Sequence, residues 1–179
     1  MKKILIIMGH PSLNSFCNSL AEKYKEGAEK SGKKVEILYL GNFNLEFDLI
    51  KAQELIKWVE HITFVYPTWW ATPPALLKSF IEKVFVPGFA YQHSKNEKSF
   101  KIDKLLKGKS ARLISTMDAP PLIYKWILGD IGGKMMEKGI LNFCGIKPVY
   151  KNYFGSVKMS SEEDRKKWLE KIYKIGLGE

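Results

Sequence analysis

The sequence predicts a doubly wound α/β fold, in which a five-stranded parallel sheet of order 2-1-3-4-5 lies between two layers of helices. Short apolar runs alternate with longer amphipathic segments along the chain, the pattern of β-α-β units whose sheet is covered on both faces. Unusual residues gather after the first, third and fourth apolar runs. In this strand order those three loops meet at the carboxyl edge of the sheet, where open α/β sheets bind ligands.

Each strand is assigned to a short apolar run between longer amphipathic segments. The first run follows Met1-Lys2-Lys3 and superficially resembles a signal peptide, but it is too short and leads directly into a patterned helix. The predicted strands are Ile4–Met8, Val35–Leu40, Ile62–Tyr66, Ala111–Thr116 and Pro148–Tyr153.

Helices are assigned where apolar residues recur every three or four positions. The first begins near Phe16 and ends at Gly32, and the last begins at the capping-box pattern of Ser160 to Glu163. The long segment Phe85–Gly108 is expected to cover the site or to make subunit contacts. The other helices are marked by Leu55, Val59 and Ile62, by Leu76 to Phe85, and by Trp126–Leu141 with a break near Gly132 and Gly133.

Size and charge limit the kinds of partner that we expect. The 179 residues, 45% of them apolar, suit one globular domain over residues 1–179. No apolar run reaches membrane-spanning length, so we expect a soluble protein in the cytoplasm. A net charge of +10 would suit nucleic acid, but glutamates are interspersed among the lysines, and the dense stretch Lys95–Lys109 lacks a series of stacking aromatics. Nucleic acid is therefore not expected as a partner.

The cysteines and histidines predict no metal site. Cys17 and Cys144 lie far apart without a second pair, and reduced thiols are the simplest interpretation. The spacing of His10, His61 and His93 does not match that of metal ligands.

The loop from Gly9 to Asn18, after the first strand, predicts an anion site. Its small hydroxyl and amide side chains lead into a helix start, where backbone N–H groups and the helix dipole favour a phosphate. Ser15 also suits the helix N-cap, a role compatible with phosphate binding. The loop lacks the glycine patterns of Rossmann dinucleotide sites and of P-loop hydrolases.

The loop after the third strand predicts a flat ligand. It places Trp69 and Trp70 next to each other, and Pro67, Pro73 and Pro74 indicate a fixed irregular loop. Large flat side chains at the end of a buried strand are typical of a ligand cleft. The alternative is that the two tryptophans pack in the core.

Four motifs, in this order, resemble those of the flavodoxin-like NAD(P)H:quinone oxidoreductases. The resemblance runs in register over roughly Lys3 to Gly155. It implies a homodimeric flavoenzyme that holds FMN or FAD noncovalently, takes hydride from NADH or NADPH and passes two electrons to quinones or similar acceptors. The motifs are Gly9-His10-Pro11 with Ser15-Phe16, Pro67-Thr68-Trp69-Trp70 with Pro74 to Lys78, Gly88-Phe89-Ala90-Tyr91, and Gly139 to Gly145.

The resemblance also assigns residues to the site. The loop after the first strand holds the flavin phosphate, the tryptophan loop lines the isoalloxazine, and the loop after the fourth strand meets its pyrimidine edge. Tyr91 matches an aromatic residue that reaches the substrate cavity, often that of the partner subunit, and Tyr124 is a second candidate catalytic residue. The cofactor-binding residues so implied are His10, Ser15, Phe16, Cys17, Asn18, Pro67, Thr68, Trp69, Trp70, Ala71, Glu82, Thr116, Met117 and Asp118.

The chain departs from the family after the fourth strand, where Ser115 to Pro121 stands in place of a Thr-Thr-Gly-Gly loop. The backbone of Thr116 to Asp118, or a rearranged loop, must then meet the flavin. Asp118 is either a turn former or a proton relay. Cys17 stands where relatives often have Asn, and is expected to contribute mainly its backbone.

Two non-enzymatic roles stay open beside the oxidoreductase. One is a one-electron flavodoxin carrier, although the chain lacks the Thr- and Gly-rich phosphate loop and the acidic surface that are usual in such carriers. The other is a flavin-binding accessory subunit that regulates a membrane transporter, the one route by which membrane association would be expected. A hydrolase is not favoured, because no Ser-His-Asp or paired-carboxylate arrangement is present.

Overall fold

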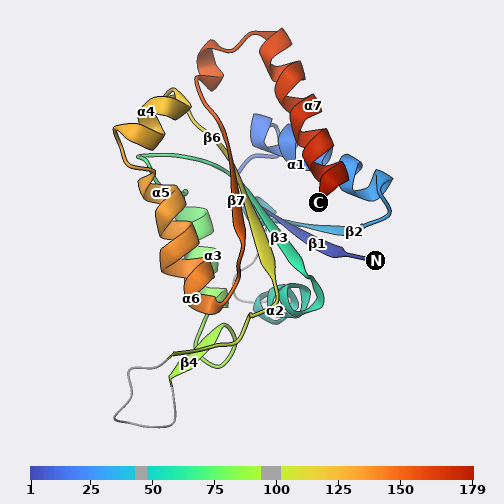
Figure 1. Ribbon diagram of the computed structural model, residues 1–179, viewed down its shortest axis with the longest axis vertical. Helices are drawn as coiled ribbons and strands as arrows, with labels where there is room; N and C mark the ends of the chain where they lie inside the picture. Colours follow the sequence, from blue (N-terminus) through green and yellow to red (C-terminus); the bar gives the residue numbers. More distant parts are fainter. Residues whose placement is uncertain (43–47, 94–101) are drawn as a thin grey trace.

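The computed structural model describes residues 1–42, 48–93 and 102–179 (Figure 1). Five parallel strands form one sheet in the order β2-β1-β3-β6-β7, which confirms the predicted order 2-1-3-4-5. Each predicted strand is correct to within one residue at either end. The strands are β1 (Lys3–Met8), β2 (Lys34–Tyr39), β3 (His61–Pro67), β6 (Ser110–Thr116) and β7 (Val149–Phe154).

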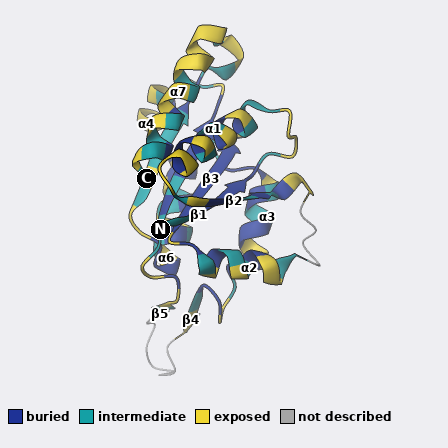
Figure 2. Ribbon diagram, turned by 90° about the vertical axis from the view of Figure 1, so that its right-hand side faces the viewer, coloured by how far each residue is buried: buried dark blue, intermediate teal, exposed yellow. Residues whose placement is uncertain are grey.

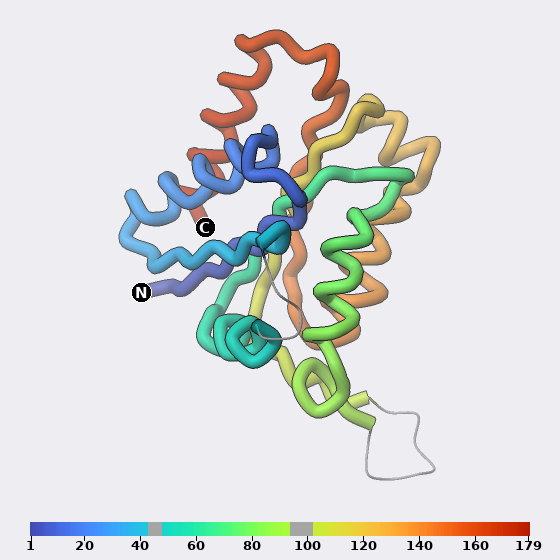
Figure 3. The backbone as a smooth tube through the Cα atoms, turned by 180° about the vertical axis from the view of Figure 1, so that it is seen from behind, coloured from blue at the N-terminus to red at the C-terminus, as the bar shows by residue number. Residues whose placement is uncertain are grey.

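Helices cover both faces of the sheet (Figures 1 and 3). Helices α1 and α7 lie on one face, while α2, α3 and the segment from α5 to α6 lie on the other. Within the described residues, no helix is both long enough and apolar enough to cross a bilayer. The helices are α1 (Phe16–Lys30), α2 (Leu49–Trp58), α3 (Ala75–Val84), α4 (Pro121–Trp126), α5 (Ile131–Lys134), the π-helix η2 (Met135–Leu141), α6 (Asn142–Cys144) and α7 (Glu162–Gly178), with short 3₁₀ turns η1 (Leu40–Asn42) and η3 (Val157–Met159).

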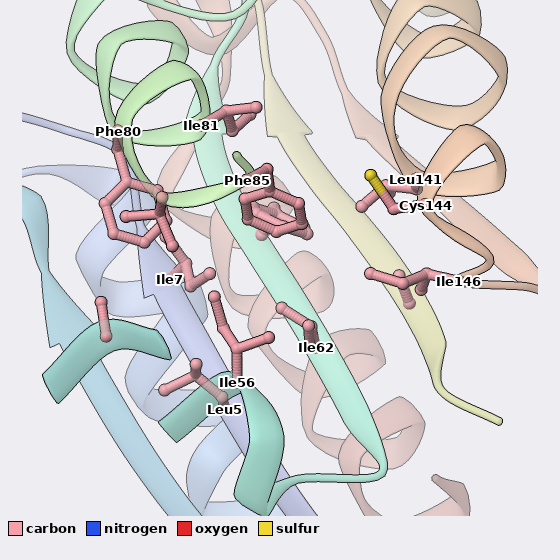
Figure 4. Packing of buried hydrophobic residues seen from close by; sticks show 14 of the residues in the cluster. Leu5, Ile7, Ile56, Ile62, Phe80, Ile81, Phe85, Leu141, Cys144 and Ile146 are labelled. Atoms are coloured by element: carbon pink, nitrogen blue, oxygen red, sulfur yellow. The ribbon is translucent and has the colours of Figure 1, made fainter. Parts of the chain in front are cut away.

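The interior strand β1 illustrates how the sheet divides the apolar core into two layers, because its side chains alternate between the faces. Ile4 and Ile6 pack with α1 and α7, whereas Leu5 and Ile7 pack with α2 and α3 on the opposite face (Figure 4). All four side chains are fully buried. Figure 2 shows the same pattern for the whole molecule, with a buried sheet between helices whose outer faces are exposed.

The caps of the first and last helices follow the sequence signals. The Ser15 side chain accepts a hydrogen bond from the Asn18 N–H, and Gly32, predicted to end the first helix, is left-handed with φ +82°. Ser161 and Asp164 form the capping box at the start of α7, one residue later than the predicted pattern of Ser160 to Glu163. The marker Ile62 was misplaced, because α2 ends at Trp58 and Ile62 lies in β3.

The predicted helix break near Gly132 and Gly133 is present but lies a few residues earlier in the chain. The chain turns earlier, at Gly129 and Asp130, and both glycines lie inside α5. Close packing explains them, since a Cβ on Gly132 would lie 2.5 Å from the carbonyl oxygen of Ala71. These glycines therefore provide space for neighbouring segments rather than a bend.

The segment Phe85–Gly108 contains a small antiparallel hairpin that was not predicted. Its strands are β4 (Tyr91–His93) and β5 (Ile102–Lys104), while residues 94–101, and with them Lys95, Lys98 and Lys101, lie outside the described residues. Phe89 in this segment is only 8% exposed and packs within the core. It is therefore not available for subunit contacts.

A buried ionic cluster closes the amino edge of the sheet. The Glu179 carboxylate accepts hydrogen bonds from Arg112 Nε at 2.6 Å and from the Tyr24 hydroxyl at 3.0 Å, and it lies 3.3 Å from Nε2 of His61. The His61 ring is fully buried. Burial lowers the pKa of His61 to about 4, although the neighbouring Glu179 carboxylate opposes this shift.

We expect acid to destabilise the protein through His61. The unfolded chain takes up a proton on this residue near pH 6.5, while the folded chain resists protonation down to about pH 4. The contribution of His61 to the free energy of unfolding is therefore fully present above pH 6.5, and it falls by about 3 kcal/mol as the pH drops toward 4. Urea unfolding between these pH values should show a weaker pH dependence for His61→Gln, whereas the control His93→Gln, at an exposed position, should behave like the parent. Equal slopes for all three proteins would contradict this expectation.

Candidate functional site

The loops after β1, β3 and β6 meet at the carboxyl edge of the sheet, as predicted, and line a cavity of about 250 Å³. All of the predicted cofactor-binding residues line it except Asn18, Trp70, Ala71 and Glu82. The full lining is His10, Ser15, Phe16, Cys17, Pro67, Thr68, Trp69, Thr116, Met117, Asp118, Val157 and Lys158.

The first wall of the cavity is the start of α1. The first turn of this helix carries no acidic residue, so its free N–H groups and positive dipole end are open to an anion. Oδ1 of Asn18 is buried and has no hydrogen-bond partner among the described residues. Cys17 Sγ lies 3.1 Å from Oγ1 of Thr116, and burial raises the pKa of the thiol to about 11. Cys17 is therefore a neutral packing group at neutral pH.

The second wall is a tight turn over Trp69–Thr72. The N–H of Trp69 donates to the carbonyl of Thr72 at 2.9 Å, and the N–H of Thr72 donates back to that of Trp69 at 3.0 Å. Trp70 and Ala71 between them have φ 51° and 62°, which makes this a type I′ turn, where Gly and Asn are usual. A left-handed residue that carries a Cβ costs about 1–2 kcal/mol.

This turn directs the two tryptophans differently. The Trp69 ring lines the cavity and lies edge-on to the His10 ring, with centroids 5.9 Å apart. Trp70 is 99% exposed, so neither core packing nor the cavity of a single chain accounts for it. Trp70 and Ala71, both predicted to contact the cofactor, therefore do not line the cavity of a single subunit.

The third wall combines the loops after β6 and β7. The N–H of Met117 donates to the carbonyl of Phe154 at 2.8 Å, so this N–H is already engaged in the sheet. Asp118 forms an ion pair with Lys158 at 2.7 Å, and both side chains are largely exposed, so that the pair adds little stability. Val157 and Lys158 were missed because the sequence analysis confined the site to three loops. The predicted order puts β7 beside β6, a signal that could have found them.

Glu82 and Tyr91 lie in a different hollow, of about 290 Å³, between α3 and the η2–α6 segment. Glu82 is exposed and ion-paired with Lys78. The Tyr91 ring packs edge-on against Phe143 with centroids 5.0 Å apart. In a single chain this hollow is separate from the cavity.

Tyr124 is buried and does not line the cavity. Its hydroxyl donates a hydrogen bond to the carbonyl oxygen of Ala71 and accepts one from the N–H of Gly133, each at 3.2 Å. Burial raises the pKa of this hydroxyl. Within a single chain, Tyr124 therefore contacts the Trp69–Thr72 turn through the Ala71 carbonyl, on the side away from the cavity lining.

Comparison with known proteins gives the family. A family described as having a flavodoxin-like fold matches residues 2–175. An uncharacterized NAD(P)H oxidoreductase of Haemophilus influenzae is 29% identical over 93% of this chain and 90% of its own length. The mouse ribosyldihydronicotinamide dehydrogenase [quinone] is 26% identical over 97% and 92%.

Solved structures agree. A crystal structure of a Streptococcus mutans protein superposes with a TM-score of 0.84 at 31% identity, covering 99% of this chain and 100% of that one. An NAD(P)H:quinone oxidoreductase from Methanothermobacter marburgensis gives 0.81 at 21% identity, covering 98% and 94%. With a family match over nearly its whole length and the fold and strand order to accompany it, the chain belongs to the flavodoxin-like NAD(P)H:quinone oxidoreductase family.

Proposed function

We propose that this protein is a cytoplasmic flavoenzyme that transfers two electrons from NADH or NADPH to quinones or similar small acceptors. The observation that carries the proposal is the convergence of the α1 start, the Trp69 ring and the loop after β6 on one cavity. The names of relatives, NAD(P)H oxidoreductase and NAD(P)H dehydrogenase [quinone], support the reaction class. A fold neighbour described as an FMN-dependent NADH-azoreductase was solved with FMN.

The residues of the cavity suit a flavin. The helix start at Ser15 to Cys17 offers N–H groups and no carboxylate to a phosphate. Trp69, which lines the same cavity, offers an aromatic ring to the ring system of the flavin. When bound, a flavin would supply the two-electron chemistry, while these residues hold and orient it. The fit concerns the phosphate and ring system that FMN and FAD share, so the proposal covers either.

The direct test is to purify the protein, release its chromophore by heat and identify it by chromatography and absorbance. The purified protein should also lose its flavin absorbance when mixed with NADH or NADPH without oxygen. A protein without flavin would overturn the proposal. Bound flavin that neither nucleotide bleaches would instead favour an accessory subunit or a one-electron carrier.

We expect nicotinamide and acceptor to use the same cavity in turn, because hydride transfer requires each to stack on the same ring. Steady-state kinetics with NADPH and a benzoquinone should then give parallel double-reciprocal lines. Intersecting lines would show a ternary complex and contradict the shared cavity.

Replacing Trp70 by Ala should impair turnover with quinone more than it impairs folding, because this side chain is fully exposed and contributes little to the core.

We propose that the protein works as a homodimer that completes each site at the subunit boundary. The support is an exposed apolar surface on α4 and the start of α5, which we call the α4 surface. An apolar patch of this kind usually meets a partner. It adjoins the tryptophan turn through Tyr124. Its residues are Leu122, Ile123, Trp126, Ile127 and Ile131.

A charge on the α4 surface should separate the subunits. Ile127 is 76% exposed, and Ile127→Glu would bury an unpaired carboxylate in the interface. Ile50 on α2 is 73% exposed, so Ile50→Glu is a matched control that should leave the dimer intact. Light scattering at micromolar concentration should give a dimer mass for the parent and the control and a monomer mass for Ile127→Glu. A monomeric parent would refute the homodimer.

A further inference from the structure

The Trp69–Thr72 turn packs against the segment where α4 leads into α5, which we call the corner. The Tyr124 hydroxyl bonds the carbonyl oxygen of Ala71, and a Cβ on Gly132 would lie 2.5 Å from that oxygen and 3.0 Å from Cα of Thr72. The corner therefore packs directly against the turn. Because left-handed backbone is unfavourable at both Trp70 and Ala71, such external contacts are needed to maintain it.

A buried polar network in turn fixes Tyr124. Its hydroxyl accepts the N–H of Gly133, and its ring packs edge-on against Tyr153, with centroids 5.3 Å apart. The Tyr153 hydroxyl donates to Oδ1 of the buried Asp130 at 2.6 Å, and Lys151 Nζ lies 2.8 Å from Oδ2. A Cβ on Gly133 would lie 2.0 Å from the Tyr153 hydroxyl, so these groups are packed without spare room.

We propose that Tyr124 is a positioning residue, whose hydroxyl keeps the Trp69–Thr72 turn in its left-handed form. The turn then holds the Trp69 ring against the cavity and directs Trp70 outward, toward the place where a second subunit would complete the site. This role differs from the catalytic one predicted from the sequence. The hydroxyl is buried and engaged on both sides, since it donates to Ala71 and accepts from Gly133.

The first test reads the turn itself and needs no activity. Protein labelled with fluorotryptophan gives one fluorine NMR signal for each of its five tryptophans, which single Trp→Phe variants assign. Tyr124→Phe should shift or broaden the Trp69 and Trp70 signals and leave those of Trp58 and Trp168 in place. The matched control is Tyr150→Phe, which removes a half-exposed hydroxyl on β7 and should change neither Trp69 nor Trp70.

A rescue variant makes the test specific. Glycine adopts positive φ without steric cost, so adding Ala71→Gly to Tyr124→Phe should restore the parental signals of Trp69. Proline cannot take a left-handed φ, so Ala71→Pro should reproduce the effect of Tyr124→Phe even with Tyr124 present. If Tyr124→Phe fails to fold, Ala71→Pro still tests the left-handed turn on which the proposal depends, because Ala71 is partly exposed. Parental Trp69 and Trp70 signals in Tyr124→Phe, or in Ala71→Pro, would overturn the proposal.

The kinetic readout rests on the proposed function. Loss of one hydrogen bond that supports the turn should raise the KM for quinone about two- to tenfold, with the pH profile of kcat unchanged. The same Ala71→Gly substitution should lower KM again. A lost limb of the kcat pH profile that Ala71→Gly does not rescue would indicate a proton-donating Tyr124 and overturn the positioning role. If the protein binds no flavin, the proposed function fails, but the NMR result still decides the role of Tyr124.

Discussion

Replacing Ser15 by Asp is expected to abolish flavin binding while the protein stays folded. Aspartate is as good an N-cap as serine, so the start of α1 should persist. Its carboxylate, however, would face the phosphate that we assign to this helix start. Two unit charges 4 Å apart near a protein surface repel by about 4 kcal/mol, so affinity should fall on the order of 1000-fold.

The measurement is the flavin content of purified protein, followed by titration of the stripped protein with flavin. Ser19→Asp adds the same charge to the same helix at an exposed position outside the cavity, and it should retain its flavin. If Ser15→Asp keeps full occupancy, the phosphate does not lie on this loop. If both variants lose the flavin, the effect belongs to the charge of α1 and not to a contact at Ser15.

The second large effect concerns stability. Helices α1 and α7 cross with their backbones in contact, because a Cβ on Gly27 would lie 2.1 Å from the carbonyl oxygen of Tyr173 and one on Gly176 would lie 2.3 Å from that of Tyr24. Gly27→Val should force α7 away from the sheet and loosen the packing of Ile172. We expect a loss of about 3 kcal/mol or more in the free energy of unfolding.

Urea unfolding of the parent and Gly27→Val measures this loss. Gly178→Ala is the control, since it lies in the same α7 helix and a Cβ there meets nothing within 4 Å. The control should match the parent to within about 0.5 kcal/mol. A Gly27→Val protein as stable as the parent would mean that the two helices do not pack this closely.

The sheet could be predicted from the sequence because its signals are local. The run Ile62 to Tyr66 consists only of β-branched and aromatic residues, which favour a buried strand, and β3 is buried at every position. The loops at the site could be predicted for a related reason. Strand order decides which loops meet, and the order follows from the alternating pattern.

What escaped prediction depends on three-dimensional neighbours. Nothing in Trp70 or Ala71 signals positive φ, so the outward direction of Trp70 could not be inferred. Gly132 and Gly133 resemble a helix break in sequence, although their function is to admit Ala71 and Tyr153 at short range. Lys158 lines the cavity only because β7, which it follows, lies beside β6, and no sequence motif marks it.

The ionic cluster at His61 and Glu179 has a practical consequence. His61 and Pro67 stand at opposite ends of β3, and six residue steps at about 3.3 Å each separate the cluster from the cavity by about 20 Å. Substitutions that far apart usually act additively on stability. The acid tolerance of this protein can therefore be tuned at His61 as an independent engineering variable, with the redox site left in its native form.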